Sequence, residues 1–434
     1  MRAEVLTIGD ELLRGEIVDS NKSFLSDRLL RLDIETHFHA SVRDEPPDME
    51  DAFRRAALRS DVVLVSGGLG PTRDDLTALI LGRSFGRELV LDEQALAGIR
   101  AFFAGVGREM TANNESQAWF PEGAEVLANP IGTAPGFMLD VGDAVFFAMP
   151  GVPRELQRMM DEQVLPRLAE RSGAGGVVVR AALLRTFGIG ESSLDAELAD
   201  VATDGSVTLG FRTSFPDNFL RPLARAASAQ EADARLTDVC DAIRQRLGAV
   251  VYSEGDESME QVVGGLLRAR GATLAAAESC TGGLIAERLT DVPGSSDYFL
   301  GGVVAYANVA KQALLGVPEA LLDQHGAVSE PVARAMAESV RAHFGADIGL
   351  ATTGISGPGG GTDAKPVGLV HIALADAAGT HADHFVFPLD RTRHRLLTTQ
   401  VALDWVRRRL LGVPLVGPTL MRRQGGSSAP QERR

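Results

Sequence analysis

The chain contains little cysteine and lacks the common zinc-binding patterns. Cys240 and Cys280 are its two cysteines among 434 residues, and neither CxxC nor HExxH occurs among them and the eight histidines. Two cysteines provide no disulfide framework. We therefore expect a reducing compartment and no structural zinc.

Long apolar runs and an excess of positive charge are also missing. The first residues, MRAEVLTIGDE, contain no apolar signal core, and no run approaches the roughly 18 apolar residues of a membrane helix. A net charge of −15 argues against broad binding to nucleic acids or anionic membranes, although a local basic cluster could still hold a phosphate. We expect a cytoplasmic protein that contacts neither nucleic acid nor membrane directly.

Enough apolar residues remain to build several cores. Hydrophobic residues make up 45% of the chain, and 434 residues predict two or three domains at about 100 to 200 residues per domain. In the first third of the chain, short apolar runs alternate with segments whose apolar residues recur at helical spacing. This alternation of strands and helices predicts a mainly parallel, doubly wound α/β sheet. Strands are expected at 5–8, 34–42 and 62–65, with helices after Asn21 and over 48–58.

Two polar loops, 9–21 and 67–75, follow these strands and should lie beyond their carboxyl ends, where such sheets bind ligands. Glycines in the second loop allow backbone N–H groups to approach a phosphate, and adjacent acids can hold a hard cation. The loop is neither a Walker A motif nor a Rossmann GxGxxG. Alternatively, it is only a tight turn, but its clustered carboxylates would then repel one another without a ligand.

The segments TIGDELLRGEIVDSN, SGGLGPTRDDLT, NPIGTAPGF and MPGVPREL follow one another in this region. They resemble the molybdopterin-binding-like domain of the CinA family, the competence- and damage-inducible proteins. The resemblance implies hydrolysis of ADP-ribose to AMP and ribose 5-phosphate with a divalent cation, for which Asp75 and Asp74 are the expected ligands. It places the substrate site at Asp10, Glu11, Asn21, Gly67, Gly68, Gly70, Thr72, Asp75, Thr133 and Gly136.

The middle of the chain predicts a small α+β unit after a linker at 172–176. We expect strands at 177–186 and 207–211 and helices at 194–201 and 229–247. The family resemblance implies a KH-like fold here. The GxxG at 173–176 precedes a strand instead of joining two helices, so the RNA clamp of a KH domain is not evident. A spacer or dimerisation role is the expectation.

The segment Glu278–Gly283, ESCTGG, follows an apolar run at 273–277. It precedes a segment whose apolar residues have helical spacing. This pattern predicts a sharp turn from a strand into a helix. Free backbone N–H groups and the helix dipole favour developing negative charge there and can form an oxyanion hole. Alternatively, Ser279 or Thr281 only caps the helix.

Further along, Lys311 is expected in the first turn of a helix capped by Asn308, where the helix dipole disfavours a cation. A deprotonated lysine acting as a base would explain that position, and a surface lysine is the alternative. Arg391 and Arg395 share one face at another helix start, which indicates an anionic ligand such as phosphate. Two exposed arginines without a ligand are the alternative.

The C-terminal segments AAAESCTGG, VAYANVAK, HGAVSEPV, TTGISGPGGG, KPVG and DRTRHR resemble the nicotinamide-nucleotide amidohydrolase domain of CinA proteins. The resemblance implies deamidation of nicotinamide mononucleotide (NMN) by a serine nucleophile, Ser279, and a lysine base, Lys311, without a cofactor. Cys280 is the alternative nucleophile, because thiolates form readily at helix N-termini. The motifs add Tyr306 to the catalytic residues and place Thr281, Gly282, Gly283, Asn308, Thr353, Gly354, Arg391 and Arg395 at the substrate. Ala307 stands where the motif leads us to expect serine.

Together these features predict an α/β protein with three domains. They are a molybdopterin-binding-like domain at 1–171, a KH-like domain at 172–255 and an amidohydrolase domain at 256–416, followed by a disordered tail at 417–434. We expect a homodimeric, bifunctional pyridine-nucleotide hydrolase with NMN and ADP-ribose as substrates. The rival functions are a molybdopterin-binding or adenylyl-transfer protein and a non-enzymatic competence or DNA-damage scaffold, although the acidic charge counts against direct DNA contact.

Overall fold

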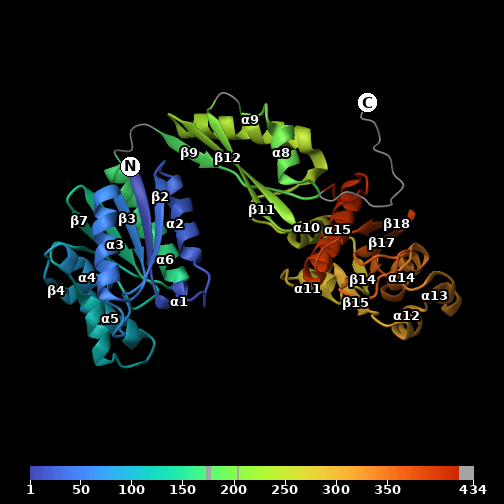
Figure 1. Cartoon of the computed structure of the whole chain (residues 1–434), viewed down its shortest axis with the longest axis horizontal. Helices are drawn as coiled ribbons and strands as arrows, with labels where there is room; N and C mark the ends of the chain where they lie inside the picture. Colours follow the sequence, from blue (N-terminus) through green and yellow to red (C-terminus); the bar gives the residue numbers. More distant parts are fainter. Residues whose placement is uncertain (173–176, 203–204, 420–434) are drawn as a thin grey trace. The chain divides into compact units, whose positions relative to one another are not determined.

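The computed structural model describes residues 1–172, 177–202 and 205–419, and Figure 1 labels their helices and strands. The chain divides into two compact units. One unit comprises residues 1–180 and 224–234, and the other comprises residues 181–223 and the chain from residue 235 on. No helix of the described residues combines the length and apolarity needed to cross a membrane.

The N-terminal unit is built on a six-stranded sheet. Its order is β2 (Glu35–Val42), β1 (Arg2–Ile8), β3 (Val62–Ser66), β8 (Ala144–Met149), β7 (Gly136–Val141) and β6 (Glu125–Leu127). The first four strands are parallel, whereas β7 runs antiparallel to β8 and β6. β3 and β8 are buried along their whole length, as expected for strands covered on both faces. The prediction of a mainly parallel, doubly wound sheet is confirmed.

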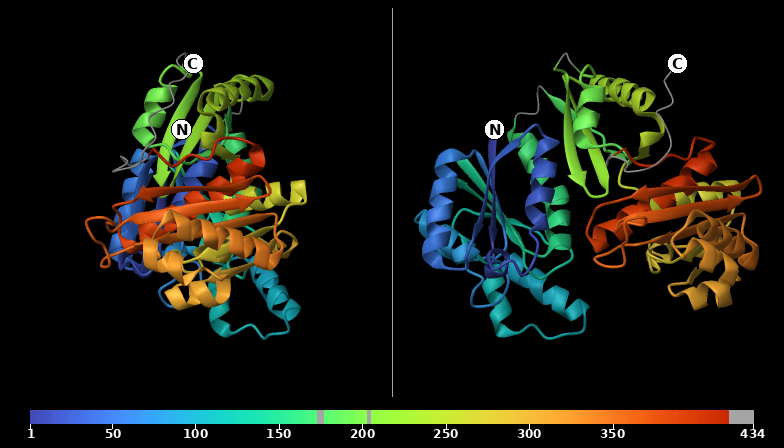
Figure 2. Two further views of the ribbon diagram at one scale, coloured as in Figure 1. Left: turned by 90° about the vertical axis from the view of Figure 1, so that its right-hand side faces the viewer. Right: turned by 45° about the vertical axis from the view of Figure 1, so that its right-hand side comes forward.

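Helices cover both faces of this sheet. One apolar cluster joins it to α3 (Pro46–Arg59) and α4 (Thr77–Ser84), and the other joins it to α2 (Ser20–Leu30), α6 (Pro153–Met159) and α7 (Leu165–Arg171). Figure 2 shows α5 (Glu93–Gly105), in cyan, beyond one end of the sheet. The shorter elements are α1 (Asp10–Leu13), β4 (Leu89–Leu91), η1 (Ala112–Ala118), β5 (Trp119–Pro121) and η2 (Met160–Val164).

The middle segment forms a second sheet with two helices. Its strands are β9 (Val178–Ala181), β10 (Leu184–Thr186), β11 (Val207–Ser214), β12 (Asp217–Ala226) and β13 (Val251–Glu254), and its helices are α8 (Glu191–Leu198) and α9 (Ala229–Leu247), with the short η3 (Gly248–Val250). The strand predicted over 177–186 is two strands, and the ten-residue β12 was not predicted. The predicted linker and its GxxG, at 173–176, lie outside the described residues.

The C-terminal sheet has the order β15 (Phe299–Val304), β14 (Leu274–Glu278), β16 (Ile348–Gly354), β17 (Leu369–Asp376) and β18 (Gly379–Val386). β14 is parallel to both of its neighbours, and β17 is antiparallel to β16 and β18. Two apolar clusters cover the two faces. One face carries α10 (Met259–Arg270), α11 (Leu284–Thr290) and α15 (Arg391–Leu411), and the other carries α12 (Asn308–Leu315), α13 (Glu319–His325) and α14 (Glu330–Phe344), with η4 (Ser295–Asp297) after α11.

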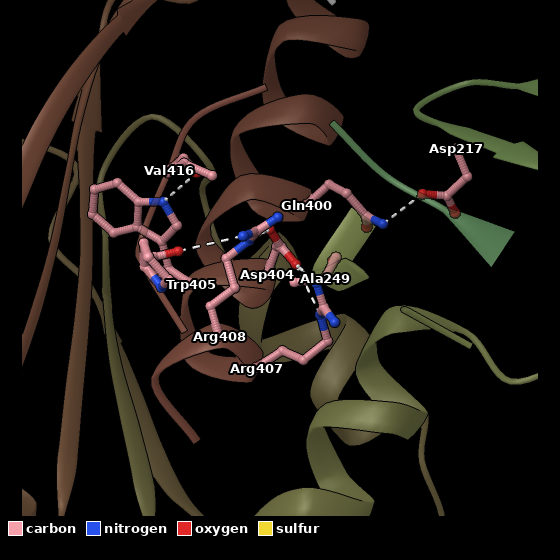
Figure 3. Close-up of polar contacts among 9 residues, drawn as sticks. Asp217, Ala249, Gln400, Asp404, Trp405, Arg407, Arg408 and Val416 are labelled. Carbon is pink, nitrogen blue, oxygen red and sulfur yellow. Dashed lines mark hydrogen bonds and ion pairs between the residues drawn. The ribbon is translucent and has the colours of Figure 1, made fainter. Parts of the chain in front are cut away.

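The long helix α15 ties the middle segment to this sheet through buried polar contacts, drawn in Figure 3. Gln400 donates a 2.7 Å hydrogen bond to Asp217 at the start of β12, and Arg407 donates a 2.5 Å bond to the carbonyl of Ala249. Asp404 pairs with both Arg407 and Arg408, so one buried carboxylate offsets part of the charge of two buried guanidinium groups. The middle and the C-terminal half of α15 are thereby tied to the middle segment.

The chain after α15 is ordered further than predicted. The backbone N–H of Thr419 donates a 2.7 Å hydrogen bond to the carbonyl of Gly188, and a side chain at Gly417 would collide with Phe385. The prediction of a disordered tail is therefore wrong for 417–419, because these residues pack on the middle segment and β18. Residues 420–434 lie outside the described residues.

Candidate functional site

Ser279 lies directly after β14, at the edge where three parallel strands end. Its backbone N–H donates a 3.0 Å hydrogen bond to the carbonyl of Thr352, which continues the pairing with β16. Gly282 and Gly283 adopt φ angles of 62° and 97°, a left-handed conformation that glycine reaches without strain. These two residues turn the chain into α11. The predicted turn from strand to helix is confirmed.

The N-cap of α11 is Gly283, so neither hydroxyl of the turn caps this helix. The hydroxyls of Thr281 and Thr352 instead pair with each other at 2.8 Å in a buried position. This pairing connects the turn to β16. The alternative that Ser279 or Thr281 only caps the helix is therefore wrong, and the hydroxyl of Ser279 is available for another partner.

That partner is Lys311, whose side chain is buried at 1% exposure. Its Nζ lies 3.0 Å from the Oγ of Ser279, 2.8 Å from the carbonyl oxygen of Ala305 and 3.2 Å from that of Tyr306. A neutral amine can donate to the two carbonyls and accept from the Ser279 hydroxyl, and an ammonium can donate to all three oxygens, so these partners serve both protonation states. Burial lowers the pKa of Lys311 below its ordinary value. The surface-lysine alternative is wrong.

Glu278 determines which backbone groups of the turn remain open. Its buried carboxylate accepts hydrogen bonds from the N–H groups of Gly283 at 2.9 Å, Ile285 at 3.1 Å and Ala286 at 2.9 Å. Within the described part of the chain, the N–H groups of residues 280–282 donate to no carbonyl or carboxylate. These three groups, next to Ser279, are the candidates for an oxyanion hole.

Sequence analysis did not select Glu278. Glu278 ends β14 five residues before Gly283, the N-cap of α11, and an acid at the end of a strand that turns into a helix is a recognisable signal, because the helix dipole favours a carboxylate near its N-terminus.

The side chain of Cys280 lies in the apolar core and does not take part in the contact between Ser279 and Lys311. Its side chain is 4% exposed and belongs to the apolar core that β14 shares with α10, α11 and α15. Burial raises the pKa of the Cys280 thiol to about 12, so the thiol stays protonated near neutral pH. The position therefore lacks the thiolate that a cysteine nucleophile requires.

Both predicted arginines reach the site from the first two turns of α15, which Asp390 caps through the N–H of Arg393. Arg391 donates to the hydroxyl of Tyr306 at 2.8 Å and to the carbonyl of Gly357 at 3.0 Å. Arg395 donates twice to the carbonyl of Thr281, at 3.1 and 2.7 Å. Arg391 thus bridges two loops at the site, whereas Arg395 supports the turn that carries Ser279.

Two other predicted residues, Thr353 and Gly354, make structural contacts that the sequence did not show, and a third, Asn308, does not have the predicted capping role. The hydroxyl of Thr353 donates to the carbonyl of Ala327 at 2.8 Å, and a side chain at Gly354 would lie 2.7 Å from the carbonyl oxygen of Leu369. Asn308 is the first residue of α12, so the prediction that it caps this helix is wrong. Ala307 occupies the N-cap without a side-chain hydrogen bond.

A second group of predicted residues meets in the N-terminal unit, around the loop after β3. Gly67 and Gly68 have φ angles of 107° and 67°. An added Cβ would lie 2.3 Å from the carbonyl oxygen of Ile8 at Gly67 and 2.2 Å from the hydroxyl of Thr77 at Gly68. Only glycine therefore fits where this loop packs against the end of β1 and the start of α4.

The same loop is closed by Asp75, whose carboxylate accepts hydrogen bonds from the N–H of Thr72 at 2.9 Å and from its hydroxyl. A side chain at Gly70 would collide with that carboxylate. Asn21 is buried beside the loop and donates to the hydroxyl of Ser66 at 3.0 Å and to the carbonyl of Gly151 at 2.8 Å. Its Oδ1 is buried without a partner among the described residues.

Several carboxylates gather near this loop. Asp44, which sequence analysis missed, accepts a 2.9 Å hydrogen bond from the backbone N–H of Asp10. Burial raises the pKa of Asp44, and the charges of Glu11, Asp10 and Asp74 raise it further. In the part of the chain that the structure describes, no three acids, histidines or cysteines form a ready metal cluster. A cation at Asp74 and Asp75 would therefore need additional oxygens from a substrate.

The last two predicted residues of this unit, Gly136 and Thr133, have different surroundings. Gly136 begins β7 and is buried, and an added Cβ would lie 2.3 Å from the carbonyl oxygen of Ala148. Close packing of β7 on β8 therefore accounts for this glycine. Thr133 lines a cavity between its own loop and α5, together with Asn129.

Each of the three domains matches a model of a known protein family. Residues 4–170 match the model described as "Probable molybdopterin binding domain", residues 182–253 match "Damage-inducible protein CinA KH domain", and residues 256–410 match "CinA C-terminal domain". The three-domain α/β layout expected from the sequence is thus confirmed.

Relatives align along nearly the full chain. The CinA-like protein of Geobacter sulfurreducens is 45% identical over 412 residues, which cover 95% of this chain and 100% of the relative. The CinA-like protein of Citrifermentans bemidjiense is also 45% identical over 412 residues, covering 95% of this chain and 98% of the relative.

Among solved structures, CinA from Thermoplasma acidophilum is 33% identical with a TM-score of 0.35, covering 39% of this chain and 96% of that one. A competence/damage inducible protein from Agrobacterium tumefaciens is 40% identical with a TM-score of 0.33, covering 34% of this chain and 90% of that one. Full-length relatives at this identity and the three matching domain models show that the chain belongs to the CinA family.

Proposed function

We propose that the C-terminal domain hydrolyses the carboxamide of nicotinamide mononucleotide to nicotinate mononucleotide and ammonia. The observation that carries the proposal is the buried Lys311, whose Nζ lies 3.0 Å from the Oγ of Ser279 and which has two carbonyl acceptors for its own N–H groups. This arrangement suits a neutral lysine that activates a serine for acyl transfer. NMN is the substrate implied by the family resemblance.

In the proposed reaction, the Oγ of Ser279 attacks the carboxamide carbon while the Nζ of Lys311 takes the hydroxyl proton. The N–H groups of residues 280–282 stabilise the oxyanion of the tetrahedral intermediate. Collapse of the intermediate breaks the C–N bond, and Lys311 returns the proton to the leaving ammonia. Water then attacks the acyl-serine, again with Lys311 as base, and releases the nicotinate product and free Ser279.

The carbonyls of Ala305 and Tyr306 accept hydrogen bonds from the ammonium form of Lys311, so the charged intermediate state keeps its partners. Arg391 and the hydroxyl of Tyr306, which bond to each other at 2.8 Å, are proposed to hold the substrate phosphate at the site entrance.

For the N-terminal domain we propose hydrolysis of ADP-ribose to AMP and ribose 5-phosphate. The tightly packed glycine loop and the unpartnered Oδ1 of the buried Asn21 support an anionic, polar ligand at this site. Asp75 and Asp74, with Asp10 nearby, would hold a divalent cation together with substrate oxygens. The cation would neutralise charge on the diphosphate. The chain's own residues would fix the diphosphate against the loop and keep Asp75 oriented through Thr72.

The test is product analysis of purified protein incubated with NMN and with ADP-ribose, each with and without a chelator. Ammonia release from NMN should resist the chelator, and AMP formation from ADP-ribose should require the cation. Adenylation of molybdopterin without either hydrolysis would favour the adenylyl-transfer alternative. Absence of all three activities would favour the scaffold.

A further inference from the structure

A groove of about 400 Å³ lies between β13, an edge strand of the middle sheet, and α10, the helix that follows it. All four residues of β13, 251–254, line the groove, together with Glu257, Gln261, Val262, Gly265 and Leu266. Successive residues of a strand point to opposite faces of its sheet. A groove lined by four residues in a row therefore runs along the edge of the strand, where backbone N–H and C=O groups lie.

The outer edge of β13 lacks a neighbour among the described strands. The middle sheet has the order β11, β12, β10 and β13, with β9 beside β12, so β13 pairs with β10 alone in the part of the chain that the structure describes. An unpaired edge can accept a further extended segment through main-chain hydrogen bonds. The groove thus suits a short peptide strand.

One buried polar group in the groove also points to such a ligand. Ser253 is 6% exposed, and its Oγ is buried without a hydrogen-bond partner among the described residues. A buried hydroxyl without a partner costs free energy, and a peptide N–H or C=O in the groove would satisfy it. Val262 and Leu266 are half-buried on the α10 side of the groove and can cover an apolar side chain. The groove therefore offers polar contacts to a backbone and apolar contacts to a side chain.

The chain after α15 leads to this groove. Thr419 is the last described residue, and its N–H and hydroxyl both donate to the carbonyl of Gly188, at 2.7 and 2.9 Å. The N–H of the neighbouring Phe187 donates a 3.0 Å hydrogen bond to the carbonyl of Val250, immediately before β13. The chain beyond Thr419 therefore starts within a few residues of the beginning of β13.

The residues that follow match the groove in type and order. The sequence continues as LMRR at 420–423, two apolar residues and then two arginines. In an extended segment that starts near Val250, the apolar pair comes first along β13, and the arginines come beside the loop 254–257 at its end. That loop carries three exposed acids, of which Glu254 also pairs with Arg244. The opposite charges favour this register.

The lengths agree as well. β13 has four residues, and four extended residues span about 13 Å, so LMRR covers the strand once. Gln424 and two glycines follow, and glycine is a poor strand former, so the pairing should end there.

We propose that residues 420–423 of this chain occupy the groove as an extended segment beside β13. The main chain of the segment pairs with the outer edge of β13 and with the Oγ of Ser253. Its two apolar side chains cover the α10 side of the groove, and its two arginines pair with the acidic loop 254–257. The contact fastens the middle segment to the first helix of the C-terminal domain.

The experiment is cross-linking in the full-length chain. Met421→Cys is combined with Gly265→Cys, whose side chain enters the groove without a clash, because an added Cβ at Gly265 meets no atom within 4 Å. Arg270→Cys is the matched control partner, at an exposed position of α10 that does not line the groove. Cys240 and Cys280 are buried and are retained. A short bismaleimide is added, and mass spectrometry of tryptic peptides measures the rate of cross-linking within one chain.

We expect the pair with Gly265→Cys to cross-link about tenfold faster or more than the pair with Arg270→Cys, because docking raises the effective concentration of residue 421 at the groove. Melting temperatures equal to that of wild type would show that both double variants fold.

A change of charge tests the arginines. Arg422→Glu combined with Arg423→Glu should lower the cross-linking rate at Gly265→Cys about fivefold, because two ion pairs of surface strength are lost. The same reversal at Arg433 and Arg434, which lie beyond the proposed segment, is the control and should change the rate little.

Hydrogen exchange gives an independent readout. In a chain that ends at Thr419, the outward-facing amides of β13 should exchange about tenfold faster or more than in wild type, because their partner is removed. The amides of β14, in the interior of the C-terminal sheet, are the internal control and should not change.

Cross-linking is the deciding measurement. Equal rates for the two cysteine pairs would overturn the proposal, whatever hydrogen exchange shows. Cross-links that join two chains instead of two positions of one chain would overturn it too, because they would place the segment on a second copy. Faster cross-linking at Gly265→Cys with unchanged exchange in the shortened chain would overturn the pairing with β13.

Discussion

Ser279 and Cys280 are adjacent in the chain but lie in different environments. Ser279 faces Lys311, and Cys280 is buried in the apolar core with its pKa raised to about 12. We predict that Ser279→Ala lowers the turnover of NMN about a thousandfold or more, because the nucleophile is lost. Cys280→Ala should keep most of the turnover and lower the melting temperature, because it removes a buried group.

Ammonia-release assays and thermal melts on the two variants measure both effects. Inactivation by iodoacetamide that follows labelling of Cys280, in a variant whose site is not blocked sterically, would reverse the choice of nucleophile.

Lys311 should control the acid side of the deamidation pH profile. Its base form is neutral, and burial lowers its pKa, so activity should fall as pH drops through that lowered pKa and the amine becomes protonated. Lys311→Ala should lower turnover by orders of magnitude without a comparable loss of NMN binding. Lys311→Arg is the charge-retaining control and should be as inactive, because a guanidinium cannot act as the base. A Lys311→Ala variant with wild-type turnover and the same acid limb would refute the mechanism.

The same pKa shift predicts how stability depends on pH. Between the lowered pKa of folded Lys311 and its ordinary value near 10.5, the unfolded chain binds a proton that the folded chain does not. The free energy of unfolding should therefore rise with pH in that window relative to Lys311→Met, which carries no titrating group. Below the window the difference should be constant. Urea denaturation of both proteins at several pH values measures this difference in the free energy of unfolding. Parallel pH dependences of the two proteins would contradict the lowered pKa of Lys311.

At the scale of elements, the start of α15 carries two arginines with different contacts. Arg391 bonds to Tyr306 and Gly357, whereas Arg395 holds the carbonyl of Thr281 in the turn of Ser279. We predict that Arg391→Ala raises the KM for NMN about tenfold or more with a smaller change in kcat, because a phosphate contact is lost. Arg395→Ala should lower kcat as well, because the turn loses its support.

Nicotinamide riboside, which lacks the phosphate, is the control substrate for this pair. It should be a poor substrate of wild type and change little in Arg391→Ala. Equal losses for NMN and the riboside in Arg391→Ala would show that this arginine supports the structure instead of the phosphate.

At the scale of the whole molecule, the two proposed sites belong to different compact units. We predict that Asp75→Asn abolishes hydrolysis of ADP-ribose and leaves NMN deamidation near wild type. The asparagine can still accept the hydrogen bond from the N–H of Thr72, so the loop should keep its shape while it loses one charge. Assays of both activities on one preparation, with Ser279→Ala as the reciprocal variant, measure the separation. Equal loss of both activities in folded Asp75→Asn would reject it.

The sequence by itself determined the alternation of strands and helices at both ends of the chain. Apolar runs such as 62–65 and 348–353 are buried strands, because both faces of each sheet are covered and periodicity reports burial directly. The middle segment was harder to predict. Pro216, Asp217 and Asn218 mark a turn after β11, but β12 was missed because Pro222 inside the segment argues against a strand.

For the candidate site, sequence analysis supplied the residue types and the tertiary structure decided their contacts. Ser279 and Lys311 are 32 residues apart, and their side chains meet because parallel strands end at the same edge of the sheet. The same convergence made Glu278 the partner of three N–H groups and Arg395 the support of the Thr281 carbonyl. Side-chain patterns do not reveal which backbone groups a fold leaves unpaired, because that depends on every neighbouring strand and helix at once.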